Sequence, residues 1–159
     1  MEWVDFLRWF HVLGACVLIG TGSGIAFFMF MANRTSNPAI ILHTASVVVI
    51  ADLVFTASAV ILQPVSGVLL AMEIGWNLMD GWIILSISLY VFIGLFWLPV
   101  VFIQMEMKKE ANFAFENNRE LNARYHRLYK IWFACGLPAF SAILMIVWLM
   151  VTKPSFALW

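Results

Sequence analysis

The sequence predicts an all-α fold, an integral membrane four-helix bundle, and three observations support that prediction. Of the 159 residues, 64% are hydrophobic, and the mean hydropathy of +0.94 lies above the range of soluble domains. Four segments each offer the roughly 20 apolar residues that a helix needs to cross a bilayer. The formal net charge is zero, so nothing in the composition points to nucleic acid as a partner. We therefore expect one transmembrane domain covering residues 1–159, surrounded by lipid.

Prolines mark several points along the expected spans. Pro38 suits the first turn of the second helix, because a first-turn residue needs no amide proton. Pro64 falls inside that long segment and should kink or break it, and Pro99 and Pro138 predict kinks in the third and fourth segments. The hydrophilic stretch 106–130 is expected to extend the third and fourth helices, with a break near Asn117. The predicted spans are about 6–32, 38–72, 82–105 and 131–151.

The basic residues predict the orientation of the bundle. Seven of the nine lie on one side of the four predicted spans, and basic residues collect on the cytoplasmic side of membrane proteins. The stretch 106–130 is therefore expected to be cytoplasmic, with both termini on the opposite side of the membrane. The seven residues are Arg34, Lys108, Lys109, Arg119, Arg124, Arg127 and Lys130.

The second and fourth spans resemble each other at an offset of 83 residues. His43 then matches His126, Ser58 matches Ser141 and Ala59 matches Ala142. This alignment suggests a two-plus-two internal repeat of the kind found in duplicated membrane proteins. Some matches between apolar spans arise by chance, so a single unduplicated bundle stays an alternative.

Three histidines fall within or beside the apolar segments, where an imidazole needs a partner because unpaired polar groups are costly in hydrocarbon. His11 lies about six residues into the first span, hence about 9 Å below the membrane surface. A neutral imidazole there could ligate iron or copper. Alternatively, His11 bonds a backbone carbonyl or a neighbouring side chain. His43 lies inside the second span, whereas His126 is expected to be interfacial and hydrated.

Asp52 is the acidic residue expected at mid-membrane depth. A carboxylate there should face the bundle, pair, or take up a proton. It could belong to a proton relay with Gln63 and His43, or it could be a packing-site hydrogen bonder. Gln63 and Gln104 are expected either to bridge helices or to contact a substrate. The candidate packing partners of Asp52 are Thr21, Ser23 and Thr56.

The first span also carries closely spaced glycines. Gly20 and Gly24 form a Gly-x-x-x-Gly step, which gives the helix a smooth face. Such a face allows close approach of another helix or of a flat macrocycle, and both interpretations stay open.

Taken together, several short motifs spread over nearly the whole chain resemble one family. That family comprises small bacterial integral membrane proteins known as DUF2269, and it implies a location in the bacterial inner (plasma) membrane without implying an activity. The motifs are Phe10-His11-Val12-Leu13-Gly14 with Gly20-Thr21-Gly22, Ala51-Asp52 with Phe55-Thr56, Leu62-Gln63-Pro64 with Gly67, Trp97-Leu98-Pro99-Val100-Val101 with Gln104-Met105, and Gly136-Leu137-Pro138-Ala139-Phe140 with Leu149-Met150-Val151-Thr152-Lys153-Pro154.

The chain is also distantly similar to HemJ-type protoporphyrinogen oxidases and CopD-like membrane proteins. Their first span carries a histidine in a comparable aliphatic setting, which corresponds to His11. The segment from Gly94 to Pro99 resembles a HemJ-type stretch, but there that stretch follows the first-span histidine, and here it lies in the third span. The similarity implies a b-type haem held through His11.

Three functional hypotheses follow, and whether the protein is an enzyme stays open. The first is haem b binding at His11, with Gly20 and Gly24 forming the slot, for electron transfer or porphyrin-related redox chemistry. The second is a non-enzymatic structural or accessory subunit, acting as a homodimer or within a larger membrane complex. The third is proton or metal-ion transport along Asp52, Gln63 and His43.

Overall fold

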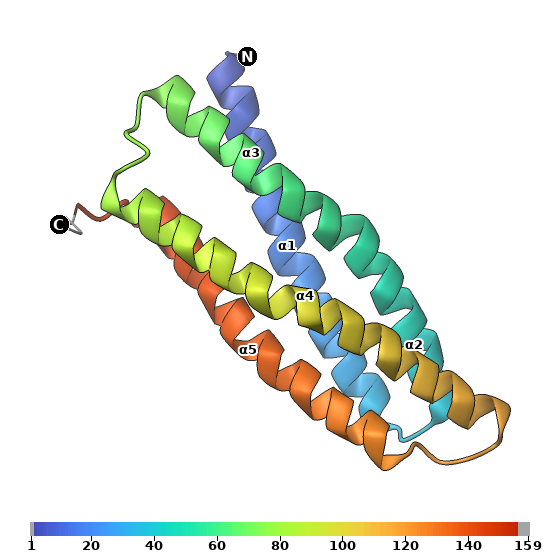
Figure 1. The fold of residues 1–159 in the computed structure, drawn as a ribbon. Coiled ribbons are helices and arrows are strands. Elements are labelled where there is room, and N and C mark those ends of the chain that lie inside the picture. Colours follow the sequence, from blue (N-terminus) through green and yellow to red (C-terminus); the bar gives the residue numbers. More distant parts are fainter. Residues whose placement is uncertain (1, 156–159) are drawn as a thin grey trace.

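The computed structural model describes residues 2–155, which form four long helices connected by short turns (Figure 1). Each is long and apolar enough to cross a bilayer, and the described residues contain no strand, so the predicted all-α four-helix fold is confirmed. The second of these helices is interrupted by one π-helical turn, Asp52–Thr56. In chain order the elements are α1 (Trp3–Arg34), α2 (Pro38–Ala51), the π turn, α3 (Ala57–Ile74), α4 (Gly81–Glu116) and α5 (Ala123–Thr152).

The hydrophilic stretch between the last two spans is mostly helical, as predicted. α4 continues to Glu116, and a short turn at 117–122 leads into α5. The side chain of Asn122 caps α5 by accepting from the Tyr125 amide at 2.9 Å, which satisfies one of the free amides of the first turn. Arg124 then pairs with Glu106 at 2.8 Å and with Glu110 at 3.2 Å. These contacts hold the ends of α4 and α5 together beyond the apolar part of the bundle.

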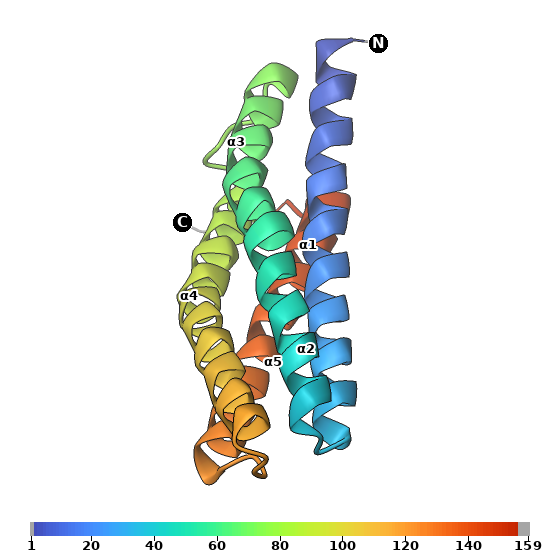
Figure 2. The ribbon, with the colours of Figure 1, turned by 90° about the vertical axis from the view of Figure 1, so that its right-hand side faces the viewer.

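The bundle has two ends with different contents. The basic end holds the turns 35–37 and 117–122, and the terminal end holds residues 2 and 153 together with the loop 75–80. In Figure 2, α1 stands beside α2 and α3, α4 lies on their other side, and α5 passes behind them. The core at the basic end draws on α1, α2, α4 and α5, and it consists of Ile25, Met29, Ala32, Ile41, Ala45, Val48, Met107, Ala111, Tyr125 and Trp132.

A smaller core closes the terminal end. It joins Ala71 of α3 and Leu149 of α5 to Trp82 and Ile83 at the start of α4. Between the two cores, α3 packs against α1 rather than along α4 or α5. The polar side chains discussed below all lie in this middle region or at its border with the basic-end core.

The π turn keeps one face of the second span directed inward. In most of this span the buried residues alternate between steps of four and three residues. Around Asp52 two steps of four follow one another, which in a regular α-helix would turn the later buried residues away from the buried face. A π turn bonds i to i+5 and so accommodates one extra residue, and such turns are often found at functional sites. The buried residues on this face are Ile41, Ala45, Val48, Asp52, Thr56, Ala59, Ser66 and Leu70.

Pro64 does not break the second span, and that part of the prediction is wrong. α3 continues through it to Ile74, and the departure from α geometry lies three turns earlier, at the π turn. Proline lacks an amide proton, so the carbonyl four residues before it, that of Val60, loses its helical partner. The hydroxyl of Tyr90 on α4 donates to this carbonyl. The helix therefore passes the proline with its freed acceptor satisfied, and α4 is tied to α3 at the same point.

Pro99 and Pro138 likewise end no helix, since α4 and α5 continue past them. The internal repeat stays a prediction. Ala59 and Ala142, which the repeat matches, are both buried, but α5 has no counterpart to the π turn.

Candidate functional site

The α1–α3 contact follows a heptad pattern with a polar layer at its centre. On α1 the facing residues are four, three and four apart, which is the spacing of a coiled-coil seam. Leu7 and Leu18 close this seam at its two ends and are buried. The seam residues are Leu7, His11, Gly14 and Leu18 on α1, and Ala59, Gln63, Ser66 and Leu70 on α3.

His11 is held by Ser66, which is 4% exposed. The Nδ1 atom of His11 lies 2.9 Å from the Ser66 Oγ, and that hydroxyl donates to the Gln63 carbonyl at 3.1 Å. In the orientation in which the Gln63 amide bonds α1, its nitrogen also lies 3.3 Å from Nδ1, so the tautomer of the imidazole decides whether Nδ1 donates to Ser66 or accepts from Gln63. Nε2 forms no hydrogen bond within residues 2–155, and the ring is partly exposed.

Gln63 reaches from α3 to the backbone of α1. Its amide orientation follows from the groups around it: the nitrogen donates to the His11 carbonyl and the oxygen accepts from the Ala15 amide, each at 3.0 Å. Those two backbone groups are the partners of one helical hydrogen bond of α1. Gln63 thus bridges helices, as one of the two interpretations of this residue expected.

Two glycines make room for these polar side chains. A Cβ atom on Gly14 would lie 2.8 Å from the end of the Gln63 side chain, and one on Gly67 would lie 3.0 Å from Cε1 of His11. Each helix therefore places a polar side chain into a notch on the other. In the sequence both glycines stand out only as parts of the family motifs, because the notches become apparent only when the register of α1 against α3 is known.

Asp52 occupies a second polar site, at the border of the basic-end core. Its side chain is 5% exposed. The Trp97 indole donates to Oδ1 at 3.3 Å, and the Gln104 amide, with its nitrogen toward the carboxyl group, donates to Oδ2 at 3.2 Å. The Gln104 oxygen accepts from the Trp132 indole at 3.1 Å. Asp52, α4 and α5 are thereby joined in one network.

Of the three expected partners of Asp52, only Thr56 lies beside the carboxyl group. Trp97 and Gln104 replace Thr21 and Ser23, and the Ser23 hydroxyl instead bonds the carbonyl of Ile19 in its own helix. Thr56 lies near the carboxyl group, but its buried hydroxyl meets no hydrogen-bond partner within residues 2–155. No Lys, Arg or His in that range lies within ion-pair distance of Asp52. Its donors are therefore all neutral.

The other histidines lie away from both polar sites. His43 and His126 are exposed near the basic end, and the His126 ring packs edge-on against Tyr125. His43 therefore joins neither Asp52 nor Gln63 in the way the relay hypothesis expected. Across the described range 2–155, no three His, Cys, Asp or Glu side chains are grouped to hold a metal ion.

Gly20 and Gly24 do not meet His11. Gly20 follows His11 by nine residues, which at 3.6 residues per turn places it on the opposite face of α1. A Cβ atom on Gly20 would contact nothing, and one on Gly24 would touch only Phe28 of the same helix. The predicted slot of His11, Gly20 and Gly24 is therefore not assembled in one place, and within residues 2–155 the glycine face packs against no other helix.

Comparisons with known proteins place the chain in a family. A family model described as a predicted integral membrane protein, DUF2269, matches residues 5–154. No curated protein matches the chain, and no solved structure matches it. The match includes both polar sites and all four helices. The protein is therefore an integral membrane protein and belongs to the DUF2269 family.

Proposed function

We propose that this protein is a proton-coupled membrane protein in which the Asp52 carboxyl group takes up and releases the proton. The observation that supports the proposal is a nearly fully buried carboxyl group that meets only neutral donors, Trp97 and Gln104. Ionisable side chains at membrane depth are costly, and they mark proton and ion pathways. For a purely structural hydrogen bond at this position, an uncharged amide side chain would cost less free energy to bury than a carboxyl group.

The surroundings of Asp52 favour proton exchange on this face of the second span. The π turn places the buried Thr56 hydroxyl close to the carboxyl group. Further along α3 come the Tyr90 hydroxyl and then the His11–Ser66–Gln63 cluster, about 16–21 Å from Asp52 at 1.5 Å per residue. These groups form a discontinuous polar stripe through an otherwise apolar bundle. Water molecules bonded between them would complete a route from the terminal end to Asp52.

We infer the orientation from the charges. The basic end, which holds the seven basic residues, would face the cytoplasm of a bacterial inner membrane, with both termini outside. The polar stripe then leads inward from the outer surface. Asp52 marks its inner limit at rest, so transfer across the membrane would require the helices of the apolar basic-end core beyond it to shift and admit water.

Proton uptake into vesicles tests the proposal. Purified protein is reconstituted into liposomes, and an enclosed pH-sensitive dye follows acidification after a pH jump. Asp52→Asn is expected to reduce uptake to the level of empty liposomes, and Asp52→Glu to retain part of it. Glu73→Gln is the matched control, since Glu73 is an exposed acid on the same span. Wild-type uptake that Asp52→Asn leaves unchanged, or no uptake above empty liposomes, would reject proton coupling at Asp52.

A second candidate function, binding of b-type haem, is favoured by the free Nε2 atom of His11. Histidine ligands of metals characteristically donate their other ring N–H to a fixed acceptor, and with its proton on Nδ1 His11 would donate in this way to Ser66, 2.9 Å away. Against this stands the displaced glycine face, so His11 alone fits an axial ligand. Bound haem would supply electron transfer or porphyrin-related redox chemistry.

Absorption spectroscopy tests this second candidate. Protein produced with ample haem is expected to show a Soret band that His11→Ala removes and His43→Ala leaves unchanged. The exposed His43 is the matched control, because it tests for adventitious haem on any histidine. A Soret band that survives His11→Ala, or the lack of any band in the wild type, would eliminate the haem hypothesis.

A further inference from the structure

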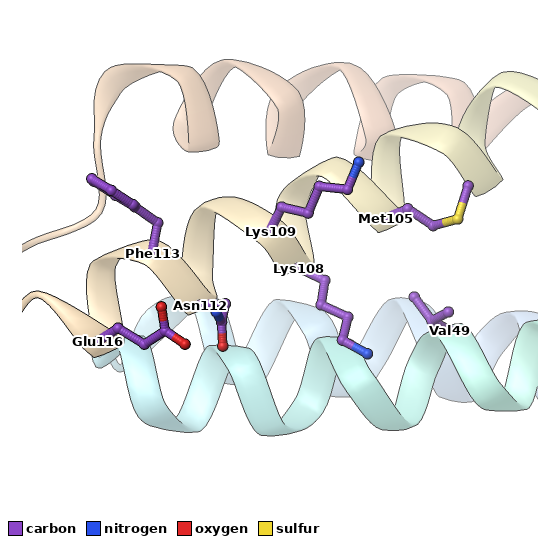
Figure 3. A pocket seen from close by; sticks show the side chains of 7 residues that line it. All are labelled: Val49, Met105, Lys108, Lys109, Asn112, Phe113 and Glu116. Atoms are coloured by element: carbon purple, nitrogen blue, oxygen red, sulfur yellow. The ribbon is translucent and has the colours of Figure 1, made fainter.

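A groove of about 540 Å³ lies between α2 and α4 near the basic end, apart from both polar sites (Figure 3). Six of its lining residues lie on α4. They follow one another at alternating steps of three residues and one residue, so they share one face of that helix. The seventh, Val49, lies across the groove on α2. The lining residues are Val49, Met105, Lys108, Lys109, Asn112, Phe113 and Glu116.

The groove changes in character along its length. Val49 and Met105 give it an apolar floor on the side of the transmembrane bundle. Lys108, Asn112 and Glu116 then follow at intervals of one turn toward the basic end. An apolar part followed by charged groups suits a molecule with a hydrocarbon chain and a polar head, lying parallel to the helices. In a membrane protein that molecule is a phospholipid of the adjacent leaflet.

The charges in the groove distinguish one class of headgroup from another. The Lys109 ammonium is 2.6 Å from the Glu106 carboxylate, and in Figure 3 it points away from α2. Lys108 points toward α2 and, like Glu116, forms no ion pair within the described residues. The groove thus presents one uncommitted cation and one uncommitted anion, with the Asn112 amide between them.

We propose that this groove binds an aminophospholipid, a lipid whose phosphate is followed by a primary ammonium group. Lys108 and Asn112 bind the phosphate, Glu116 accepts from the ammonium, and an acyl chain lies along Val49 and Met105. A purely anionic headgroup would meet the Glu116 carboxylate without compensation. A trimethylammonium headgroup would leave Glu116 without a hydrogen-bond donor.

Native mass spectrometry of the full chain with added lipids tests this assignment. The probes are phosphatidylethanolamine, phosphatidylglycerol and phosphatidylcholine with identical acyl chains. The wild-type protein is expected to retain phosphatidylethanolamine best. Lys108→Gln should weaken phosphatidylethanolamine and phosphatidylglycerol about threefold each, as for one partly exposed charge contact. Glu116→Gln should weaken phosphatidylethanolamine alone by a similar factor and so reverse or abolish its advantage over phosphatidylglycerol.

Lys109→Gln is the matched control, because it removes the same charge from the same groove at a lysine already paired with Glu106. It should leave the lipid preference unchanged. Equal retention of the three lipids, or a preference that Glu116→Gln does not alter, would overturn the proposal. Equally strong binding of water-soluble glycerophosphoethanolamine would also overturn it, since the site would then recognise a free phosphate compound rather than a membrane lipid. These three outcomes are independent of proton uptake at Asp52.

Discussion

Gly14→Val is expected to lower the free energy of unfolding by about 2–4 kcal/mol. Even the first added carbon would lie 2.8 Å from the end of the Gln63 side chain. Gln63 would have to withdraw, which breaks its bonds to the His11 carbonyl and the Ala15 amide in the middle of the α1–α3 seam. The two methyl groups of valine would in addition push the helices apart. Unfolding of the purified protein by increasing mole fractions of dodecyl sulfate in mixed micelles measures the change.

Gly20→Val provides the comparison on the same helix. Its Cβ would contact nothing, so the change should alter the free energy of unfolding by less than about 0.5 kcal/mol. If Gly14→Val and Gly20→Val proved equally tolerated, Gly14 would not be the notch that admits Gln63. If Gly20→Val were the more harmful of the two, the glycine face would be packed against something after all.

Tyr90→Phe is the second substitution with a large expected effect, about 1–2 kcal/mol of lost stability. It removes the hydroxyl that donates to the Val60 carbonyl, and Pro64 provides no amide to replace it. The carbonyl then stays unpaired in an apolar setting, and α4 loses its side-chain link to α3. The same detergent unfolding measurement detects the loss.

A double-mutant cycle with Pro64→Ala isolates the cause. Alanine returns an amide proton to position 64, so the Val60 carbonyl regains a helical donor. Pro64 is exposed, and little packing is lost with its ring. In the Pro64→Ala background, Tyr90→Phe is expected to cost less than about 0.5 kcal/mol. An undiminished cost would mean that Tyr90 stabilises the protein through its ring contacts and not through the orphaned carbonyl.

The spans could be predicted because bilayer thickness imposes a length and a composition that are visible in single segments. The end of α4 at Glu116 could be predicted as well, because the stretch 106–130 has a helical composition with a break near Asn117. The pairing of Glu106 and Glu110 with Arg124 on the following helix could not, because it depends on the tertiary structure. The expected break at Pro64 was wrong because the compensating donor, Tyr90, comes from another helix. The sequence shows which helical hydrogen bond a proline removes, but only the tertiary structure shows which donor replaces it.

The candidate site could likewise be predicted only in part. His11, Asp52 and Gln63 could be singled out because polar groups are rare in apolar spans. Their partners could not, because Ser66 and Trp97 are ordinary residues in a membrane helix until the register between helices is fixed. Gly20 and Gly24 form a recognisable motif in the sequence, yet the glycines against which polar side chains pack are Gly14 and Gly67. A motif within one helix does not reveal which face meets a neighbour.

The reciprocal notches on α1 and α3 also determine which parts of the molecule can move. Sliding or rotating α1 against α3 would require His11 to leave Gly67 and Gln63 to leave Gly14 at the same moment. These two helices therefore behave as one rigid body. Between that pair and α4–α5, the side-chain hydrogen bonds are those of the Tyr90 hydroxyl and of the donors around Asp52, in addition to the apolar contacts of the two cores. The proton uptake proposed for Asp52 would alter the hydrogen bonds at that boundary, and a rearrangement of one helix pair against the other would be its expected structural consequence.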